Sequence, residues 1–395
     1  MSNRRNDYNR YNDDYNRRPP KKKGNGLLVV LLILIAILVV FIAVIVRDAL
    51  TADEDSEPGF IRRVIAPAET REEPTPRPRE EVLKGIEHYN PLTGEVMDLG
   101  LAQQRPIAVV LNNISDSLPH NGVSKADIIY EYPVEGGLSR MLALYQDFSD
   151  VGMVGSIRSA RHYTVQLANS YDAILVGAGR SSQAAEEVRA LGIPFLNEVE
   201  GPERDIFFRD RSRIPGRRVD NLHAVVTTGE RMMQWLPEYN FRLEHESSYE
   251  HMISFTEDGT PENGSNANQV VAHLSTGKSS AFYYDAEKGT YHMHQYNRDF
   301  TDANDDSRPG FTNVLIIKTS VTNIQGDASG RVNVTTTGMG DGYFINGGKF
   351  IEINWSRSDI SSPFHYTQKN WAPLDFGIGK TFICIVPANL NPIFE

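Results

Sequence analysis

Charged and hydroxyl side chains gather between residues 152 and 162, in the sequence GMVGSIRSARH. Arg158 and Arg161 stand there between a predicted short strand or loop and the start of a predicted helix. Arginine offers a planar fork of N–H donors that matches carboxylate or phosphate oxygens, and a helix N-terminus favours negative charge. The pair therefore indicates an anion-binding site. The alternative is a structural ion-pair network, with Glu131, Glu135 or Asp147 as partners.

A second glycine-rich turn, Gly177-Ala178-Gly179, leads from a predicted strand into the next predicted helix. Such a turn lets backbone N–H groups approach an anion closely. If the two arginine-bearing helix starts are neighbours in space, they form one pocket for phosphate or carboxylate. Its predicted lining comprises Arg158, Arg161, Arg180, Ser181 and Ser182. A bare G-x-G spacing is common, however, and the two serines are equally explained as helix caps.

Two acidic residues, Glu131 and Glu135, lie four positions apart in the sequence YEYPVE. In an extended strand an even spacing puts both carboxylates on one face, and paired carboxylates can do acid–base chemistry on a glycan. Spacing alone fixes no such geometry. The alternative, which we favour, is that one carboxylate pairs with Arg140 and the other is solvated.

A serine nucleophile has no specific signal in this chain. Ser181 or Ser182 could in principle be activated by His162 or His223, but neither serine lies in a G-x-S-x-G elbow. The helix-cap interpretation explains both serines without any catalytic role.

The sequence evidence for a metal site is equally weak. His292 and His294 share one face of a predicted strand, but the sequence names no third ligand. The segment 302–306 resembles the start of a calcium loop, yet Ser307 and Asn313 replace the glycine and glutamate that the loop requires. We therefore predict no metal and no cofactor.

Hydrophobic periodicity divides the folded part into two predicted domains. Strand patterns alternate with helix patterns over residues 88–245, which predicts an α/β domain. Beyond residue 250, short β-rich runs separated by Asp, Asn and Gly predict a mostly antiparallel β domain over 250–395. The predicted strands of the first domain are 105–113, 126–134, 140–148 and 171–179, and its predicted helices are 159–170, 181–192 and 227–236.

An uninterrupted apolar segment, residues 27–46, precedes the folded part. As a helix it spans about 30 Å, the thickness of a bilayer's hydrocarbon core. Arg and Lys dominate before the segment and acidic residues after it, which predicts a cytoplasmic N-terminus and an extracellular bulk. We thus expect a disordered cytoplasmic tail (1–26), a single-pass transmembrane helix in the cell membrane (27–46) and a charged, Pro-rich linker (47–87).

The formal net charge of −11 argues against nucleic acid as a partner, so any anion site must be a local basic pocket. Cys384 is the only cysteine, which excludes an intrachain disulfide and a cysteine-based metal site. An exported domain of this size without disulfides suggests a bacterial surface.

Several stretches together resemble the YerB-like family of bacterial surface proteins, a domain of unknown function with its own C-terminal β module. The resemblance covers about residues 88–395 and is most specific in EGGLSR and GSIRSAR. The matching stretches are NPLTG (90–94), RPIAVVLNN (105–113), ADIIYEYPVEGGLSRMLALY (126–145), GSIRSARHY (155–163) and GYFINGGKFIEINWS (342–356).

Carried over position by position, the resemblance implies a set of characteristic polar residues: Glu131, Glu135, Arg140, Arg158, Ser159, Arg161 and Arg298. It also implies a cell envelope of the Gram-positive type, but it supplies no activity. Two features depart from the family pattern. Many members are lipoproteins, whereas a transmembrane helix is predicted here, and residues 219–226 read VDNLHAVV where a Pro-His-Asn-Leu pattern is expected.

Three functions remain open at this stage. The first is a non-catalytic envelope module that binds an anionic cell-wall polymer or an envelope protein through Arg158, Arg161 and Arg180. The second is an enzyme that processes cell-wall glycan or a lipid-linked glycopolymer with Glu131 or Glu135. The third is a scaffold for envelope proteins that needs no pocket. The sequence does not decide between them, nor does it give the oligomeric state.

Overall fold

The computed structural model describes residues 88–200, 205–247 and 249–395. The predicted tail (1–26), transmembrane helix (27–46) and linker (47–87) lie outside these residues. Among the described helices, none is long and apolar enough to cross a bilayer.

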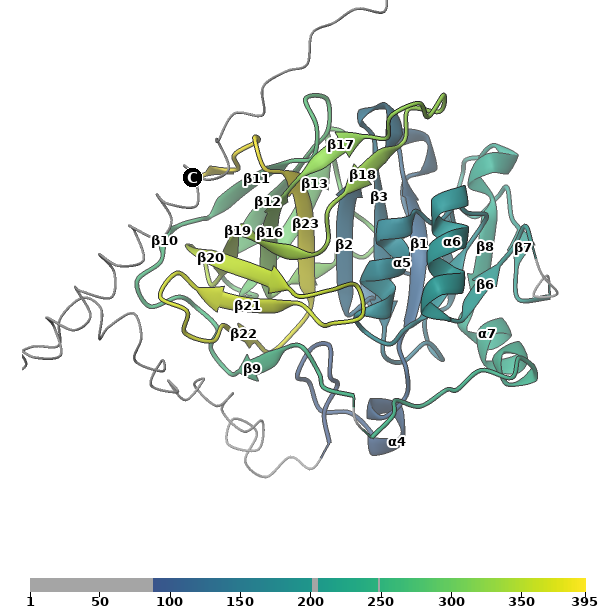
Figure 1. The fold of residues 1–395 in the computed structure, drawn as a ribbon, viewed down its shortest axis with the longest axis horizontal. Coiled ribbons are helices and arrows are strands. Elements are labelled where there is room, and N and C mark those ends of the chain that lie inside the picture. The colour runs from purple at the N-terminus through teal and green to yellow at the C-terminus, as the bar shows by residue number, and fades with distance from the viewer. Residues whose placement is uncertain (1–87, 201–204, 248) are drawn as a thin grey trace, which may run out of the picture. The chain divides into compact units, whose positions relative to one another are not determined.

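One mixed β-sheet runs through the whole described part (Figure 1). In spatial order its strands are β10 (Ser265–Asn266), β20 (Lys349–Arg357), β19 (Gly338–Asn346), β16 (Asn313–Thr319), β23 (Thr381–Pro387), β2 (Ile128–Pro133), β3 (Ser139–Tyr145), β1 (Ile107–Asn113), β5 (Ile174–Gly177) and β6 (Phe195–Asn197). A further strand, β21 (His365–Gln368), pairs with β20.

For the described residues, the predicted fold class, an α/β domain followed by a separate, mostly antiparallel β domain, is wrong. Strands outnumber helices over the described chain as a whole, and β23 from the second half lies between β2 of the first half and β16. It pairs in parallel with both neighbours, so that Cys384 stands opposite Glu131 on one side and Ile316 on the other. The large sheet therefore contains strands from both sides of the boundary that we expected at residues 245–250. The domain limits themselves, 88–245 and 250–395, stay a prediction.

A second sheet covers one face of the large one. Its order is β14 (Arg298–Asp299), β13 (Thr290–Gln295), β12 (Ser279–Asp285), β11 (Gln269–His273) and β24 (Ile393–Phe394), with β15 (Gly310–Phe311) paired to β13. Smaller sheets join β4 (Met153–Gly155), β8 (Val225–Thr228) and β7 (Phe208–Arg209), β17 (Val321–Asn323) and β18 (Val332–Val334), and β9 (Ser254–Thr256) and β22 (Asp375–Gly377).

Helices are short and lie mainly beside β1 and β5 (Figure 1). Ser181 caps α6, because its Oγ accepts a hydrogen bond from Ala184 N at 3.1 Å, and Gly192 ends this helix in the left-handed conformation. The α-helices are α4 (Leu99–Ala102), α5 (His162–Asn169), α6 (Ser182–Leu191) and α7 (Gly229–Trp235). The 3₁₀ turns are η1 (Ser115–Ser117), η2 (Val123–Lys125), η3 (Glu135–Gly137), η5 (Asn221–His223) and η6 (Leu236–Glu238).

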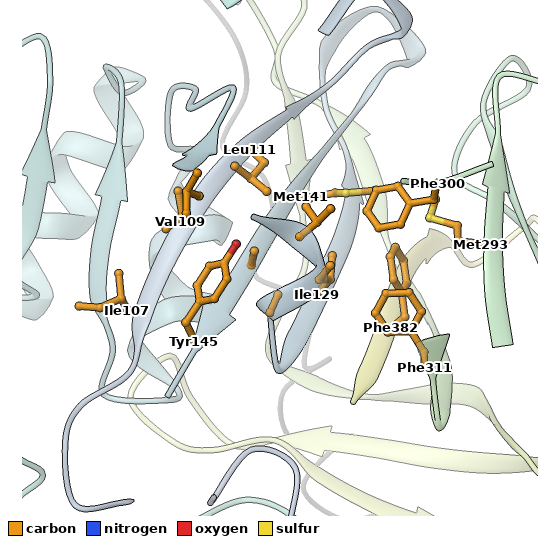
Figure 2. Packing of buried hydrophobic residues seen from close by; sticks show 14 of the residues in the cluster. Ile107, Val109, Leu111, Ile129, Met141, Tyr145, Met293, Phe300, Phe311 and Phe382 are labelled. Carbon is orange, nitrogen blue, oxygen red and sulfur yellow. The ribbon is translucent and has the colours of Figure 1, made fainter. Parts of the chain in front are cut away.

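The large sheet is buried on both faces, which explains why its central strands are almost continuously apolar. Successive side chains of a strand point to opposite faces, so Val109 and Ile129 belong to one core cluster, whereas Val110 and Ile128 belong to the other. The first cluster includes the second sheet, where Phe382 of β23 contacts Phe311, with ring centroids 5.1 Å apart (Figure 2). The second cluster includes the buried face of α5.

Candidate functional site

The candidate site lies at one edge of the large sheet, where several strands end together. Strands β1, β2, β5 and β6 run in the same direction, since β1 is parallel to β5, β5 is parallel to β6, and β1 and β2 are both antiparallel to β3. Their carboxyl ends therefore share an edge, at which β3 begins. In open sheets of this kind, ligands bind beyond the carboxyl ends of the strands.

Two arginines from different elements meet one carboxylate at this edge. Glu135 stands in the turn η3 between β2 and β3, and Arg161 immediately precedes α5. The guanidinium of Arg161 donates to both carboxylate oxygens, with 3.2 Å between Nε and Oε2. Arg140, at the start of β3, reaches Glu135 Oε1 from 3.5 Å and donates to the carbonyl of Ser159 at 2.5 Å.

Arg158 adds a third positive charge to this group. It donates from Nη1 to the carbonyl of Leu222 at 3.2 Å, while its Nε is buried without a partner among the described residues. Burial lowers the pKa of Arg158, and the positive charge of Arg161 lowers it further. Burial and then Arg161 likewise lower the pKa of Arg140 to about 10. Burial is the larger cause of both shifts, and the charge of a neighbouring guanidinium adds to it.

One carboxylate balances only part of this charge. Burial alone would raise the pKa of Glu135, but the hydrogen bonds and charge of Arg161, together with Arg140, lower it. Glu135 is therefore ionised at neutral pH. Within this group of four side chains, three positive charges face one negative charge. We name Glu135, Arg140, Arg158 and Arg161 the arginine cluster.

Arg180 is a neighbour of the cluster through its backbone only. The segments 158–161 and 178–181 run side by side, because Ala160 N donates to Gly179 O at 3.0 Å and Ser181 N donates to Ala160 O at 3.1 Å. The side chain of Arg180, however, forms an ion pair with Glu200 at 2.8 Å.

The two serines of the predicted pocket have local partners. Ser181 is the cap of α6, and the exposed Ser182 contacts Gln183. Neither histidine that could serve as a base approaches them by a hydrogen bond, since His223 contacts Asn112 at 2.9 Å and His162 contacts Asn333 at 2.7 Å. Of the predicted anion pocket, the structure thus brings Arg158 and Arg161 together, adds Arg140, and gives Arg180, Ser181 and Ser182 other partners.

Glu131 does not lie beside Glu135 but in a separate, fully buried network. Its carboxylate accepts hydrogen bonds from Asn113 Nδ2 at 2.8 Å and Ser139 Oγ at 2.7 Å, and from Ser280 Oγ of the second sheet at 2.6 Å. It also forms an ion pair with Lys278, whose Nζ is 2.9 Å from Oε1. The sequence alternative of a solvated glutamate is wrong for this residue, because its exposure is 0%.

Lys278 is held from several sides. Its Nζ donates to Ser280 Oγ at 2.7 Å and to Gln295 Oε1 at 2.9 Å, and Gln295 Nε2 donates in turn to Asn113 Oδ1 at 2.8 Å. A buried polar network whose members are all hydrogen-bonded fixes the packing around it. This network therefore joins the two sheets and leaves Glu131 without access to a substrate.

The sequence analysis missed the partners of Glu131. The sequence did contain a signal for one partner, Asn113. The polar pair Asn112-Asn113 ends an otherwise apolar strand, all of whose residues are buried. The others could not be found, since Lys278 and Ser280 approach Glu131 only when the second sheet packs on the first. Arg298, predicted as part of the same polar set, lies exposed on β14 and contacts Ser115 Oγ at 3.4 Å.

The predicted metal-binding patterns serve structural roles. Asp302 is buried and accepts hydrogen bonds from the backbone N–H groups of Gly122 at 3.0 Å and Ser124 at 2.8 Å. His292 contacts the carbonyl of Pro309, and His294 contacts Asp299. Within the described ranges, no group of three or more His, Cys, Asp or Glu side chains is arranged to hold a metal ion.

Comparison with known proteins agrees with the resemblance noted in the sequence. Two models of one family of proteins of unknown function, DUF3048, match the chain: the N-terminal domain matches residues 92–241 and the C-terminal domain matches residues 270–383. The chain belongs to this YerB-like family. It is 28% identical over 299 residues to the predicted lipoprotein YerB of Bacillus subtilis (strain 168), which covers 75% of this chain and 86% of that protein.

The fold is shared as well. The crystal structure of YerB from Bacillus subtilis matches the YerB-like chain with a TM-score of 0.64 at 26% sequence identity, over 75% of this chain and 96% of that one. The resemblance stated from EGGLSR and GSIRSAR is therefore confirmed. Both stretches contribute to the arginine cluster, through Glu135, Arg140, Arg158 and Arg161.

Proposed function

We propose that this YerB-like protein is a non-catalytic module of the bacterial cell surface that binds an anionic envelope polymer through the arginine cluster. The observation that carries the proposal is the pairing of two guanidinium groups, those of Arg140 and Arg161, with one carboxylate at the carboxyl edge of the sheet, while the charge of a third, Arg158, acts on the same group. The surface location is supported by the relative in Bacillus subtilis, which is a predicted lipoprotein.

The charge balance supports an anion as ligand. The chain as a whole is negative, at −11, so a polyanion is repelled by most of its surface and attracted only where positive charge is in excess. Arg140 and Arg161 are buried, with exposed fractions of 7% and 6%, and their shared partner is Glu135. Arg158 is less buried and forms no ion pair among the described residues, which makes it the arginine that a ligand reaches first.

The rival function, a glycan-processing enzyme that uses Glu131 and Glu135 together, has no geometric support. Glu131 is fully buried with four donors around its carboxylate, and Glu135 is paired with two arginines. A general acid or base must reach the proton that it transfers, and neither carboxylate is available for that.

Co-sedimentation with purified cell-wall sacculi tests the proposal. The full-length chain is mixed with sacculi that retain or lack their anionic glycopolymers, at low and at high salt. We expect retention only with the anionic polymer, a decrease with salt because exposed charges are screened, and loss in Arg158→Gln. The matched control is Arg308→Gln, which removes another partly exposed arginine, one paired with Asp299 at 3.0 Å.

Two results would contradict the proposal. Retention that is the same with and without the anionic polymer would exclude that polymer as the ligand. Equal retention of Arg158→Gln and the unaltered chain would exclude the arginine cluster as the site. Thermal unfolding of both variants, with midpoints near that of the unaltered chain, ensures that a loss of binding is not a loss of fold.

A further inference from the structure

An open pocket of about 430 Å³, called the cavity below, is lined by residues of β10, β20 and β21 and of the loops beside them. Figure 1 shows these three strands at the other end of the large sheet. This volume falls within the range of small-molecule sites. Residues that line it include Asn263, Phe350, Glu352, Gln368, Lys369 and Asn370. In the sheet order, β19, β16, β23, β2 and β3 separate β20 from β1, so the cavity is distinct from the arginine cluster.

The apolar part of the cavity is rigid. Phe350 stacks on Phe394 of the second sheet, with ring centroids 3.7 Å apart and planes 9° from parallel. Tyr343 packs against both rings, at 6.0 Å and 5.1 Å. An aromatic side chain that is fixed in this way offers a preformed apolar surface at little entropic cost on binding.

The polar part of the cavity has hydrogen-bonding capacity to spare. The side chains of Asn263 and Gln368 form no hydrogen bond within the described part of the chain, and Asn370 uses only Oδ1, which accepts from Ala372 N at 2.9 Å. Each primary amide carries two N–H donors and a carbonyl acceptor. The cavity therefore presents both donors and acceptors to a ligand, side by side with an apolar surface.

The charges around the cavity disfavour an anion. Lys369 is already neutralised, since its Nζ contacts Asp341 Oδ1 at 2.5 Å and Asn354 Oδ1 at 3.1 Å. Glu352 forms no ion pair among the described residues and leaves the lining negative. Phosphate or carboxylate groups are repelled here, whereas hydroxyl groups, which donate as well as accept, match the amides and Glu352.

An exposed tryptophan extends this surface. Trp371 directly follows Asn370 and is 58% exposed. Its backbone is held in the turn after β21, because Trp371 N donates to Gln368 O at 2.9 Å and Gln368 N donates to Ala372 O at 2.9 Å. The exposed indole ring offers a flat apolar face directly after the lining residue Asn370 in the chain.

We propose that this cavity binds a neutral saccharide. A pyranose ring has an apolar face for Phe350 or Trp371 and a rim of hydroxyl groups for Asn263, Gln368 and Glu352. Among the described residues that line the cavity, none requires the ligand to be charged. The site does not depend on the arginine cluster, so each proposal can fail without the other.

Titration of the full-length chain with chitotetraose and with maltotetraose, followed by ligand-observed saturation-transfer NMR, tests the proposal. The two probes are neutral chains of N-acetylhexosamine and of hexose. We expect saturable binding of at least one probe, weakened about tenfold or more in Asn263→Ala/Gln368→Ala, because two side chains lose their hydrogen bonds to the ligand. Tyr283→Ala, which removes an exposed aromatic ring on β12, leaves binding within about twofold.

The result is decisive either way. Absence of saturable binding of both probes up to about 10 mM, far weaker than ordinary specific recognition, overturns the proposal. Binding that survives Asn263→Ala/Gln368→Ala, or that is lost in Arg158→Gln, places the saccharide elsewhere and also overturns it. All variants affect exposed or half-exposed side chains, and unchanged thermal unfolding verifies that they fold.

Discussion

Replacing Lys278 by methionine tests the role of the buried network between the two sheets. Methionine fills the space of the lysine stem without its charge. The side chains of Lys278 and Glu131 are 3% and 0% exposed, and their Nζ and Oε1 atoms lie 2.9 Å apart. The variant leaves a carboxylate in the interior with only neutral donors around it, from Asn113, Ser139 and Ser280.

The expected loss of stability follows from this geometry. Removing one partner of a buried ion pair costs about 3–5 kcal/mol. The three remaining donors still solvate the carboxylate, and each hydrogen bond to a charged group contributes about 1.5–3 kcal/mol. We therefore expect a loss near the lower end, about 3 kcal/mol. With a urea slope of about 3 kcal/mol/M, the unfolding midpoint falls by about 1 M.

The assay is urea unfolding of the full-length chain at about pH 8. Lys288→Met is the matched control, since Lys288 pairs with Asp285 at 3.0 Å but its side chain is 67% exposed. Exposed pairs of this kind contribute at most about 1 kcal/mol.

A second variant separates the charge from the packing. In Lys278→Met/Glu131→Gln no charge remains in this network, and the new amide can accept from Asn113 and donate to Ser280. We expect it to be at least about 1 kcal/mol more stable than Lys278→Met alone, because neighbouring residues in one network are not additive. A loss below about 1 kcal/mol in Lys278→Met, no larger than that expected for the exposed pair of Lys288, would refute the assigned role of the ion pair.

Three further predictions concern titratable groups outside this network. Burial alone would raise the pKa of Asp172, but hydrogen bonds from His245 and Arg242 lower it to about 2. The stabilisation by Asp172 is therefore present above the ordinary carboxyl pKa near 3.8 and is lost as the pH falls through about 2. The stabilities of Asp172→Asn and the unaltered chain, measured by urea unfolding, should converge at acid pH, and a constant difference would contradict this. Burial raises the pKa of Asp127 to about 6. The stabilisation by protonated Asp127 is therefore present below about pH 3.8 and is lost as the pH rises through about 6. The stability of the unaltered chain relative to Asp127→Asn should fall by roughly 3 kcal/mol over that interval, and a stability difference that does not change with pH would contradict the shift. Burial also raises the pKa of the Cys384 thiol well above its usual value. A thiol-specific alkylating reagent should therefore label the native chain no faster than the structure around β23 unfolds locally. Rapid labelling without urea would contradict this and show that β23 is accessible.

The local elements were largely predictable from the sequence. The strand predicted over 126–134 is β2 (Ile128–Pro133), and the helix predicted over 181–192 is α6 (Ser182–Leu191). Alternation, apolar runs and helix caps are local signals, and they survive folding because each element buries the face that its pattern marks. The arrangement of the elements was not predictable. The apolar run of β23 indicates a strand buried on both faces, but nothing in it names β2 and β16 as neighbours.

The candidate site was likewise predictable only where its residues lie close together in the chain. Arg158 and Arg161 are three residues apart and meet because one short segment carries both. Glu135 lies in the turn before β3 and Arg140 lies at the start of β3. They approach this segment because β1 pairs with β3 and the segment pairs with β1, where Arg158 N donates to Val110 O at 2.9 Å. Lys278 and Glu131, in contrast, are far apart in the chain and belong to different sheets, and only the packing of those sheets brings them together.

The central position of β23 has a consequence for the order of events in folding. Residues 381–387 are synthesised after both of their neighbours, β2 and β16, yet they lie between these two strands in the middle of the large sheet. Until they arrive, β2 and β16 each expose an unpaired edge, and such edges recruit other chains. Synthesis from the N-terminus therefore cannot be accompanied by stepwise completion of the sheet. β2 and β16 cannot be joined until residues 381–387 are available, and a product that stops short of residue 381 lacks the strand that joins its two halves.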